Sequence, residues 1–356
     1  MFLPVSRSKC RERGKSGLSP FSVTQFNTKI TTLAASNSLP DLGYFYEPNV
    51  LQWGMNGQFV DLTDFYKNAP AKLDTLKFVT PDGKIVGISV ANEIQVIWYN
   101  KKMFDAAGLP YPPAEVSKAW TWDQYVAVAK KLTKDANGKT PDDTGFDAQN
   151  IRSFGTWVQD WWMPWITFAI SNGGGFVSDD GKTLLLGRPE TIEAIQKMAD
   201  LVNVHHVGPA PGTQQMPTAA ATALLSQQVA MVVDGTWDLL TIGTTKDESG
   251  LDFGVGVLPY LKKPADSSVG TPIVVYKSSR NIPEALKLLK YVMSPENSLP
   301  LLKSGLWLPN EKQWYTDPKY ISQWVDNPRH PPEYKTAEDV VKNEIMPKIL
   351  PIFKGE

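Results

Sequence analysis

The chain has 356 residues, of which 42% are hydrophobic and 21% charged, and 36 basic residues against 37 acidic residues give a net charge of −1. This length favours two domains, and this composition is typical of a soluble globular protein. The balanced charge excludes the basic face that nucleic-acid binding requires, so we expect no nucleic-acid partner.

The N-terminal segment 1–20 does not have the pattern of an export signal. Five basic residues between Arg7 and Lys15 stand where a secretory signal carries an apolar run of about 7 to 15 residues. We therefore expect 1–20 to be disordered or non-native, with no signal peptide visible in the chain. Cys10 is the only cysteine, which excludes an intrachain disulfide.

From about Val23 onward, strand-like runs alternate with helical periodicity, which predicts an α/β fold. Helices are expected over Thr24–Ser36, from the capping box Thr121–Gln124 to Leu132, from Pro189 onward and over Pro283–Met293. Strands are expected over Asp41–Phe45, Ile85–Val90, Ile94–Tyr99, Val229–Val233 and Phe253–Leu258.

Three details of this pattern can be checked. Ala91–Glu93 separates two strand-like runs, and Asp234 with Gly235 ends another. Helical spacing places Ile192, Ile195, Ala199 and Val202 on one face of the helix that begins at Pro189.

The chain lacks the usual catalytic and cofactor motifs. Three Gly-Lys-Thr/Ser fragments, at 14–16, 138–140 and 181–183, lack the earlier glycine of a phosphate-binding loop. The three histidines lack metal-ligand spacing to other candidate residues. We expect no cofactor and no metal.

Tryptophan is the most distinctive feature of the composition, with 12 residues. Trp161 and Trp162 lie in a run of four tryptophans, and Trp237 follows the strand Val229–Val233. Aromatic rings can cover the apolar face of a sugar, and ligands of open α/β sheets bind beyond the carboxyl ends of strands. The alternative for each tryptophan is packing within its own lobe.

Three polar residues have a similar placement. Glu93 lies between two strand-like runs, where the chain could cross between lobes, and Tyr46 and Glu47 follow the strand Asp41–Phe45. Ionised carboxylates accept strong hydrogen bonds from hydroxyl groups. Each could instead be a solvated bend.

The order of short motifs resembles family 1 extracellular solute-binding proteins of ABC importers, of the maltose and multiple-sugar type. The motifs are Ala35-Ser36 through Pro40-Asp41-Leu42, Gly57–Leu62, Asp82–Ile88, Tyr99–Phe104, Ala107–Leu109, Thr121–Asp123, Val229–Met231 with Gly235–Trp237, and Lys277–Arg280 with Ser294–Glu296. Val86 replaces a tyrosine that is usual in this family.

This resemblance implies two α/β lobes of the type II periplasmic-binding-protein fold, joined by a hinge. It implies an incomplete N-lobe over 21–92 that lacks its initial strand and helix, a C-lobe over 93–266, an N-lobe return over 267–305 and a C-lobe closing segment over 306–356. The chain is then incomplete at both termini.

The resemblance also implies a function without catalysis. The chain would be a monomeric, extracytoplasmic protein that binds a mono- or oligosaccharide between its lobes and delivers it to ABC permease subunits. The candidate ligand-binding residues are Phe45, Tyr46, Glu47, Glu93, Trp161, Trp162, Trp237, Gly270 and Trp307.

Two alternatives stay open. A glycosidase could use a carboxylate pair such as Glu93 and Asp160, which would have to lie about 5 to 9.5 Å apart. The same fold could bind a non-sugar solute such as a glycerol phosphodiester, a polyamine or a peptide.

Overall fold

The computed structural model describes residues 23–68, 77–178, 182–210, 220–311 and 313–334. The expected disordered segment 1–20 lies outside these residues. The described helices are α1 (Val23–Ala35), α2 (Glu47–Met55), α3 (Thr63–Lys67), α4 (Lys101–Ala107), α5 (Trp122–Leu132), α6 (Trp162–Ser171), α7 (Pro189–Asn203), α8 (Ala220–Leu225), α9 (Asp238–Ser249), α10 (Ile282–Met293), α11 (Pro295–Lys303), α12 (Gln313–Thr316), α13 (Pro318–Trp324) and a 3₁₀ turn, Val116–Lys118.

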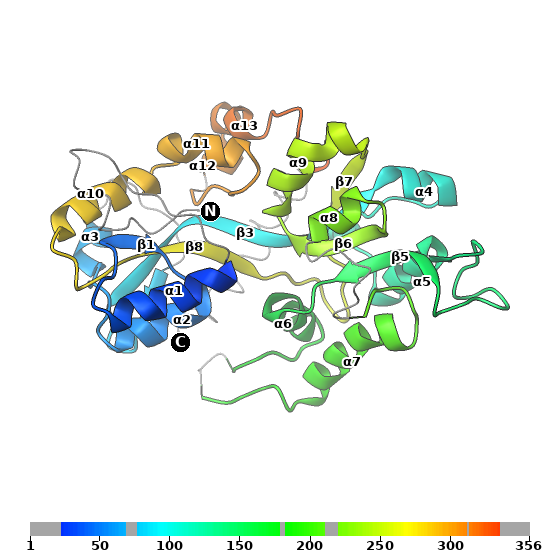
Figure 1. Ribbon diagram of the computed structural model, residues 1–356, viewed down its shortest axis with the longest axis horizontal. Helices are drawn as coiled ribbons and strands as arrows, with labels where there is room; N and C mark the ends of the chain where they lie inside the picture. Colours follow the sequence, from blue (N-terminus) through cyan, green and yellow to red (C-terminus); the bar gives the residue numbers. More distant parts are fainter. Residues whose placement is uncertain (1–22, 69–76, 179–181, 211–219, 312, 335–356) are drawn as a thin grey trace.

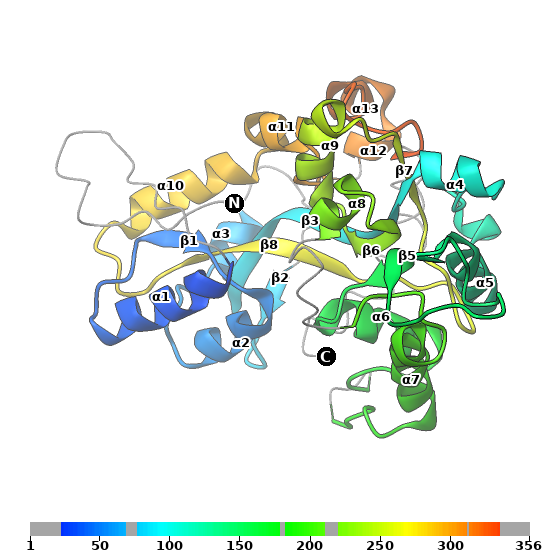
Figure 2. The same cartoon turned by 45° about the vertical axis from the view of Figure 1, so that its right-hand side comes forward.

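The strands form one mixed sheet that runs through both halves of the molecule (Figures 1 and 2). They are β1 (Leu42–Tyr44), β2 (Lys77–Val79), β3 (Ile85–Asn100), β4 (Lys134–Asp135), β5 (Ile151–Val158), β6 (Val229–Gly235), β7 (Phe253–Gly256) and β8 (Ser268–Val275). Their order is β1-β8-β3-β6-β5-β4, and β2 and β7 also pair with β3. The expected α/β class is confirmed.

The long strand β3 connects the two lobes. It pairs with β8 up to Ile94 and with β6 from Gln95 onward. The expected break at Ala91–Glu93 is therefore wrong: the chain stays extended through these residues, with only a register shift between Ser89 and Asn92. A β-bulge of this kind bends a strand without ending it. The expected lobe boundary at 92/93 lies near this exchange of partners and stays a prediction.

Two further expectations were wrong. The strand β6 does not end at Val233 but continues to Gly235, because Asp234 and Gly235 pair with Val96 and Gln95 of β3. In α7 the buried positions include Thr191, Ala194 and Leu201. The Thr191 hydroxyl donates a hydrogen bond of 2.9 Å to the Leu185 carbonyl, so the face of α7 that carries Thr191 is the one that packs against the rest of the lobe.

The face predicted to carry Ile192, Ile195, Ala199 and Val202 is therefore not the buried face of α7. Ile192 and Ile195 are 56% and 40% exposed, respectively. Ala199 and Val202 are half-buried. The capping box of α5 is confirmed, with the Gln124 amide donating to the Thr121 hydroxyl and the Thr121 amide donating to the Gln124 side chain.

The hydrophobic cores differ on the two faces of the sheet. On one face, a single core includes residues of both lobes, from Leu42 and Leu289 to Leu239 and Trp324. On the other face, one core lies under α1 and α2 of the N-lobe and a separate core lies under α5 and α7 of the C-lobe. The lobes are thus continuous on one side of β3 and divided on the other (Figure 1).

After β3 and β8, the segment that contains Leu308 is the third to lie at the junction of the lobes, beside β3. Asn92 of β3 and Leu308 form an isolated antiparallel bridge, and Asn310 donates to the Ser89 carbonyl at 2.8 Å. Gly270 of β8 packs directly on this junction: a Cβ atom at Gly270 would lie 2.0 Å from Ser89 Oγ and 2.6 Å from Ser89 Cβ. The crossing segments therefore have no space for a larger residue at Gly270.

Replacing Gly270 by alanine should destabilise the protein, because Ser89 and the crossing backbone must move. We expect a loss of about 1 to 3 kcal/mol, typical of overpacking, measured by urea unfolding. Gly187→Ala is the control, since a Cβ atom there meets no atom within 4 Å. Equal stability of the two variants would contradict the tight crossing.

Candidate functional site

The two lobes meet through Tyr46 and Trp162. Tyr46 caps the N-terminus of α2 in the N-lobe, and Trp162 begins α6 in the C-lobe. The indole Nε1 of Trp162 donates a hydrogen bond of 2.9 Å to the Tyr46 hydroxyl. Figure 1 shows α6 on the side of the C-lobe that faces α1 and α2. Both side chains are half-buried, so this bond lies at an accessible junction between the lobes.

Three tryptophans from two segments of the C-lobe pack together at this junction. The Trp161 ring centroid lies 5.4 Å from that of Trp162 and 5.7 Å from that of Trp237. Trp237 precedes α9, and its ring covers Gly235, where a Cβ atom would lie 2.2 Å from the ring. Trp237 thus keeps its position only because residue 235 has no side chain.

Glu93 lies beside the Trp237 segment. It is the one residue of β3 that is not fully buried. Its neighbour Ile94 is bonded twice to Thr236: the Thr236 amide donates to the Ile94 carbonyl at 2.8 Å, and the Ile94 amide donates to the Thr236 hydroxyl at 3.3 Å. These bonds join residues adjacent to Glu93 and Trp237, so the two expected ligand residues belong to one region.

Tyr44 and Glu47 complete the N-lobe side. Glu47 is only 7% exposed, and its carboxyl is hydrogen-bonded to the Tyr44 side chain. Burial raises the pKa of Glu47 to about 8. Burial also raises the pKa of Tyr44, with further contributions from the charges of Glu47, Glu93 and Tyr46. These interactions place the four side chains close together.

We call this set the interlobe cluster. Its members are Tyr44, Tyr46, Glu47, Glu93, Trp161, Trp162 and Trp237. Six of the seven were expected from the sequence, and Tyr44 was missed. The signal for Tyr44 was the alternation of a strand, because side chains at positions 44 and 46 project to the side opposite Phe45.

Three candidate residues lie elsewhere. Phe45 is 2% exposed, among the rings of Phe26, Trp53 and Phe59. Trp307 is also 2% exposed, in the core shared by both lobes, and Gly270 is buried at the strand crossing. Their ligand-binding role stays a prediction, and for the two aromatic residues it requires a conformation that uncovers their rings.

The sequence also gave no signal for a pair of buried acids next to Trp237. Asp234 is the next-to-last residue of β6 and is 7% exposed, and Asp238 begins α9. Their side chains are hydrogen-bonded to each other, and Asp234 also accepts a hydrogen bond of 2.8 Å from the Gly235 amide. Burial raises the pKa of Asp234 to about 7 and raises that of Asp238 as well, with repulsion from Asp234 as a further cause.

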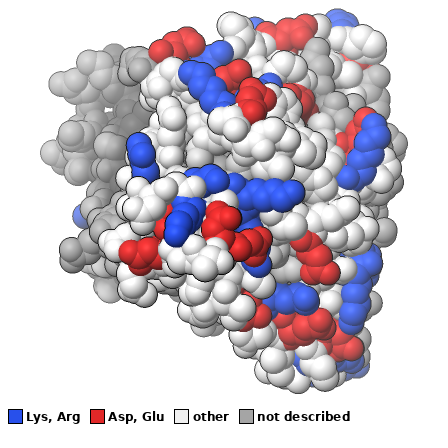
Figure 3. All heavy atoms as spheres, turned by 90° about the vertical axis from the view of Figure 1, so that its right-hand side faces the viewer, with Lys and Arg blue, Asp and Glu red and all other residues white. Residues whose placement is uncertain are grey.

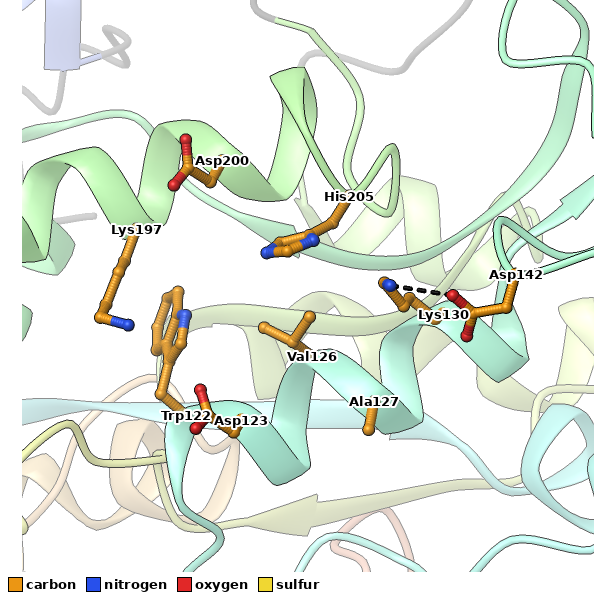
Figure 4. A pocket seen from close by; sticks show the side chains of 9 residues that line it. All are labelled: Trp122, Asp123, Val126, Ala127, Lys130, Asp142, Lys197, Asp200 and His205. Carbon is orange, nitrogen blue, oxygen red and sulfur yellow. Dashed lines mark hydrogen bonds and ion pairs between the residues drawn. The ribbon is translucent and has the colours of Figure 1, made fainter.

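A separate pocket of about 300 Å³ lies on the C-lobe, between α5 and α7 (Figure 4). Lys197 extends from α7 towards Trp122, and Lys130 is paired with Asp142 at 2.9 Å. Asp200 accepts a hydrogen bond from Gln196. Basic and acidic groups balance one another here, as they do over the surface in Figure 3. This pocket has no side chain from the N-lobe, so we assign the functional site to the interlobe cluster.

Two other properties hold for the described residues. They contain no group of three or more His, Cys, Asp or Glu side chains that could hold a metal ion. None of the helices in this part of the chain combines the length and the apolar character needed to cross a membrane.

Glu47 should make stability depend on pH. The folded protein keeps a proton on Glu47 up to about pH 8, whereas an unfolded chain loses it near pH 4.3. The free energy of unfolding should therefore fall as pH rises between these values and level off above them. Glu47→Gln should weaken this decrease, as measured by urea unfolding from pH 4 to 9.

The matched control is Glu284→Gln, since Glu284 is an exposed acid on α10. It should leave the pH profile of the wild type unchanged. A Glu47→Gln profile with the wild-type slope would show that Glu47 is ionised in the folded protein.

Comparison with known sequences finds one family over most of the chain. The profile described as bacterial extracellular solute-binding protein matches residues 18–331. A binding protein of Brucella abortus is 24% identical over 292 residues, covering 80% of this chain and 66% of the relative. The chain thus spans about two-thirds of that relative's length.

Two shorter matches have named ligands. The arabinooligosaccharide-binding protein of Halalkalibacterium halodurans is 27% identical over 53% of this chain and 39% of its own length. The sn-glycerol-3-phosphate-binding periplasmic protein of Brucella abortus is 27% identical over 51% of this chain and 37% of its own length.

Solved structures share the fold. An ABC substrate-binding protein of Listeria monocytogenes in complex with cycloalternan has a TM-score of 0.75 at 23% identity, over 92% of this chain and 79% of its own. The maltose/maltodextrin-binding domain of Bdellovibrio bacteriovorus, bound to maltotriose, has a TM-score of 0.68 at 21% identity, over 90% and 78%. The expected two-lobe binding-protein fold is confirmed, and the chain belongs to the bacterial extracellular solute-binding protein family.

Proposed function

We propose that this protein binds a mono- or oligosaccharide between its lobes and delivers it to the permease subunits of an ABC importer, as an extracytoplasmic monomer. The observation that carries the proposal is the interlobe cluster, in which tryptophan rings of the C-lobe meet carboxyl and hydroxyl groups of the N-lobe. No other group of described side chains combines these chemistries from both lobes.

The chemistry of the cluster suits a sugar. Pyranose rings have apolar C–H faces and a rim of hydroxyl groups, so they need rings to stack on and acceptors to bond. Trp161 and Trp237 supply the aromatic surface. The Tyr46 hydroxyl supplies a polar partner on the N-lobe, and Glu93 supplies another on the strand β3 that crosses between the lobes.

Sugar delivery depends on movement of the lobes. We propose lobes near the expected boundaries 21–92, 93–266, 267–305 and 306–356, which close around the ligand by bending at the crossing strands. A ligand favours the closed state only through contacts that improve on closure. Contacts that involve both Trp237 and Tyr46 have this property because they link a C-lobe ring to a side chain of the N-lobe.

A glycerol phosphodiester is the second candidate, because one relative is named for glycerol 3-phosphate. A phosphate group needs cations or clustered N–H donors. The ionisable members of the interlobe cluster are instead two carboxylic acids and two phenols. Like charges in the site disfavour an anionic ligand, so the sugar is the better supported candidate.

Catalysis has weaker support. Asp160, the possible partner of Glu93 in a glycosidase, is exposed in the segment before α6 and is outside the interlobe cluster. The family consists of binding proteins. Product formation from an oligosaccharide would favour an enzyme.

Trp237→Ala should abolish most of the carbohydrate affinity, because the indole ring that lies over Gly235 is lost as a stacking surface. We expect a decrease of about 10- to 100-fold, equivalent to one stacked aromatic face at about 1.4 to 2.8 kcal/mol. The measurement is calorimetric titration with maltotriose, an arabino-oligosaccharide and glycerophosphocholine.

Trp120→Phe is the control, because Trp120 packs on the C-lobe core near α5. It should keep wild-type affinity. Binding of glycerophosphocholine and of no saccharide would contradict the sugar proposal, and equal saccharide affinity of wild type and Trp237→Ala would contradict the site.

Tyr46→Phe should open the ligand-free protein, since it removes the hydrogen bond between Trp162 and Tyr46 of the N-lobe. Loss of such a bond shifts the equilibrium by about 0.5 to 1.5 kcal/mol. Small-angle X-ray scattering without ligand should give a larger radius of gyration than wild type. Tyr291→Phe, on the exposed surface of α10, is the control. An unchanged radius would mean that this bond does not hold the lobes together.

A further inference from the structure

In the sequence, Trp237 lies between two aspartate residues, and neither has a role in the proposed contacts with a sugar. Asp234 is three residues before it, at the end of β6, and Asp238 is the next residue, at the start of α9. Their side chains are hydrogen-bonded to each other. The pair therefore closes a short loop, Asp234–Asp238, that carries Trp237.

The partners of this pair come from the loop itself. Asp234 accepts from the Gly235 amide at 2.8 Å, and Asp238 Oδ2 is enclosed without a hydrogen-bond partner. Among the described residues, the only ionisable group that acts on either carboxyl is the other member of the pair. Two buried carboxylates this close cannot both be ionised, so they must hold at least one proton between them.

The strand beside the loop fixes its other end. Asp234 pairs with Val96 of β3, and the Trp98 indole donates to the Gly235 carbonyl at 3.0 Å. The backbone before Trp237 is thus held by β3. The backbone after it is held by the first turn of α9 and by the Asp234–Asp238 contact.

We infer that Asp238 is a positioning residue for the binding site: its proton-sharing contact with Asp234 holds Trp237 across Gly235, in the orientation that faces Trp161. The sugar-binding role of Trp237 rests on the proposed function, but its positioning by Asp238 does not. The two can therefore be tested separately.

Positioning is tested without a ligand, on the full chain. The emission of Trp237 is isolated as the difference between each protein and the same protein carrying Trp237→Phe. Asp238→Ala should change the wavelength and acrylamide quenching of this difference signal, because the loop loses its internal contact. Asp238→Asn should restore the wild-type signal below pH 6, where its amide replaces a neutral carboxyl as hydrogen-bond partner.

The pH profile of the Trp237 emission distinguishes positioning by Asp238 from a general packing role of the Asp238 side chain. The wild-type Trp237 signal should change as the pair loses a proton near neutral pH, since both pKa values are raised by burial. In Asp238→Asn only Asp234 can ionise, so the change should move to lower pH. Glu47 also titrates near the junction and Glu93 contributes a charge there, but both residues are the same in both proteins and cancel in the comparison.

Asp247→Asn provides the control, because Asp247 is on the same helix with a side chain 90% exposed. It should behave as wild type. A Trp237 signal that is unchanged in Asp238→Ala, or an Asp238→Asn protein that matches Asp238→Ala at every pH, would overturn the inference.

Saccharide titration then separates the two proposals. Asp238→Ala should weaken maltotriose or arabino-oligosaccharide binding about tenfold, as expected when one buried hydrogen bond is lost, and Asp238→Asn should restore it in acid. If the emission results hold and no saccharide binds the wild type, the positioning role stands and the proposed function fails. If the emission results hold and saccharide affinity is the same in all variants, the positioning role stands and Trp237 is not part of the saccharide site.

Discussion

The strand β3 is the constraint on which the rest of the structure depends. It contributes to both lobes, it changes partners from β8 to β6 between Ile94 and Gln95, and all of its residues except Glu93 are buried. A strand that is shared in this way cannot rotate with one lobe alone, so relative movement has to be absorbed where β3 is bulged, between Ser89 and Asn92. The half-buried Glu93 therefore lies next to the bending point.

The hydrophobic cores are distributed unevenly over the two faces of the sheet, and this determines on which side the lobes can separate. One core is shared by both lobes on the side of the sheet covered by α8 to α13, and two separate cores lie on the other side. Separating the lobes on the divided side exposes little core, because the interlobe cluster there is half-buried and partly polar. Opening on the shared side would break a single large core. The proposed ligand site thus lies on the side of the sheet where the hydrophobic cores are divided.

Much of this arrangement could be predicted from local sequence. Alternation and capping predicted the helices α1, α5, α7 and α10 and the strands β1, β3, β6 and β7. The positions after strand ends predicted Tyr46, Glu47 and Trp237. The errors arose where tertiary contacts override local pattern: pairing with β3 keeps Asp234 extended, and the Thr191 hydroxyl bond turns α7 away from Ile192. Phe45 was expected at the ligand only because of the resemblance to the family, and the structure buries its ring in the N-lobe. The Asp234–Asp238 contact depends on the angle between β6 and α9, which no sequence pattern encodes.

Hydrogen–deuterium exchange with and without saturating oligosaccharide tests most directly whether both lobes form one binding site. The account predicts simultaneous protection of three separate segments: 44–47 in the N-lobe, 92–95 in the shared strand and 235–239 in the C-lobe. Protection confined to one lobe, or centred on the pocket between α5 and α7, would contradict it.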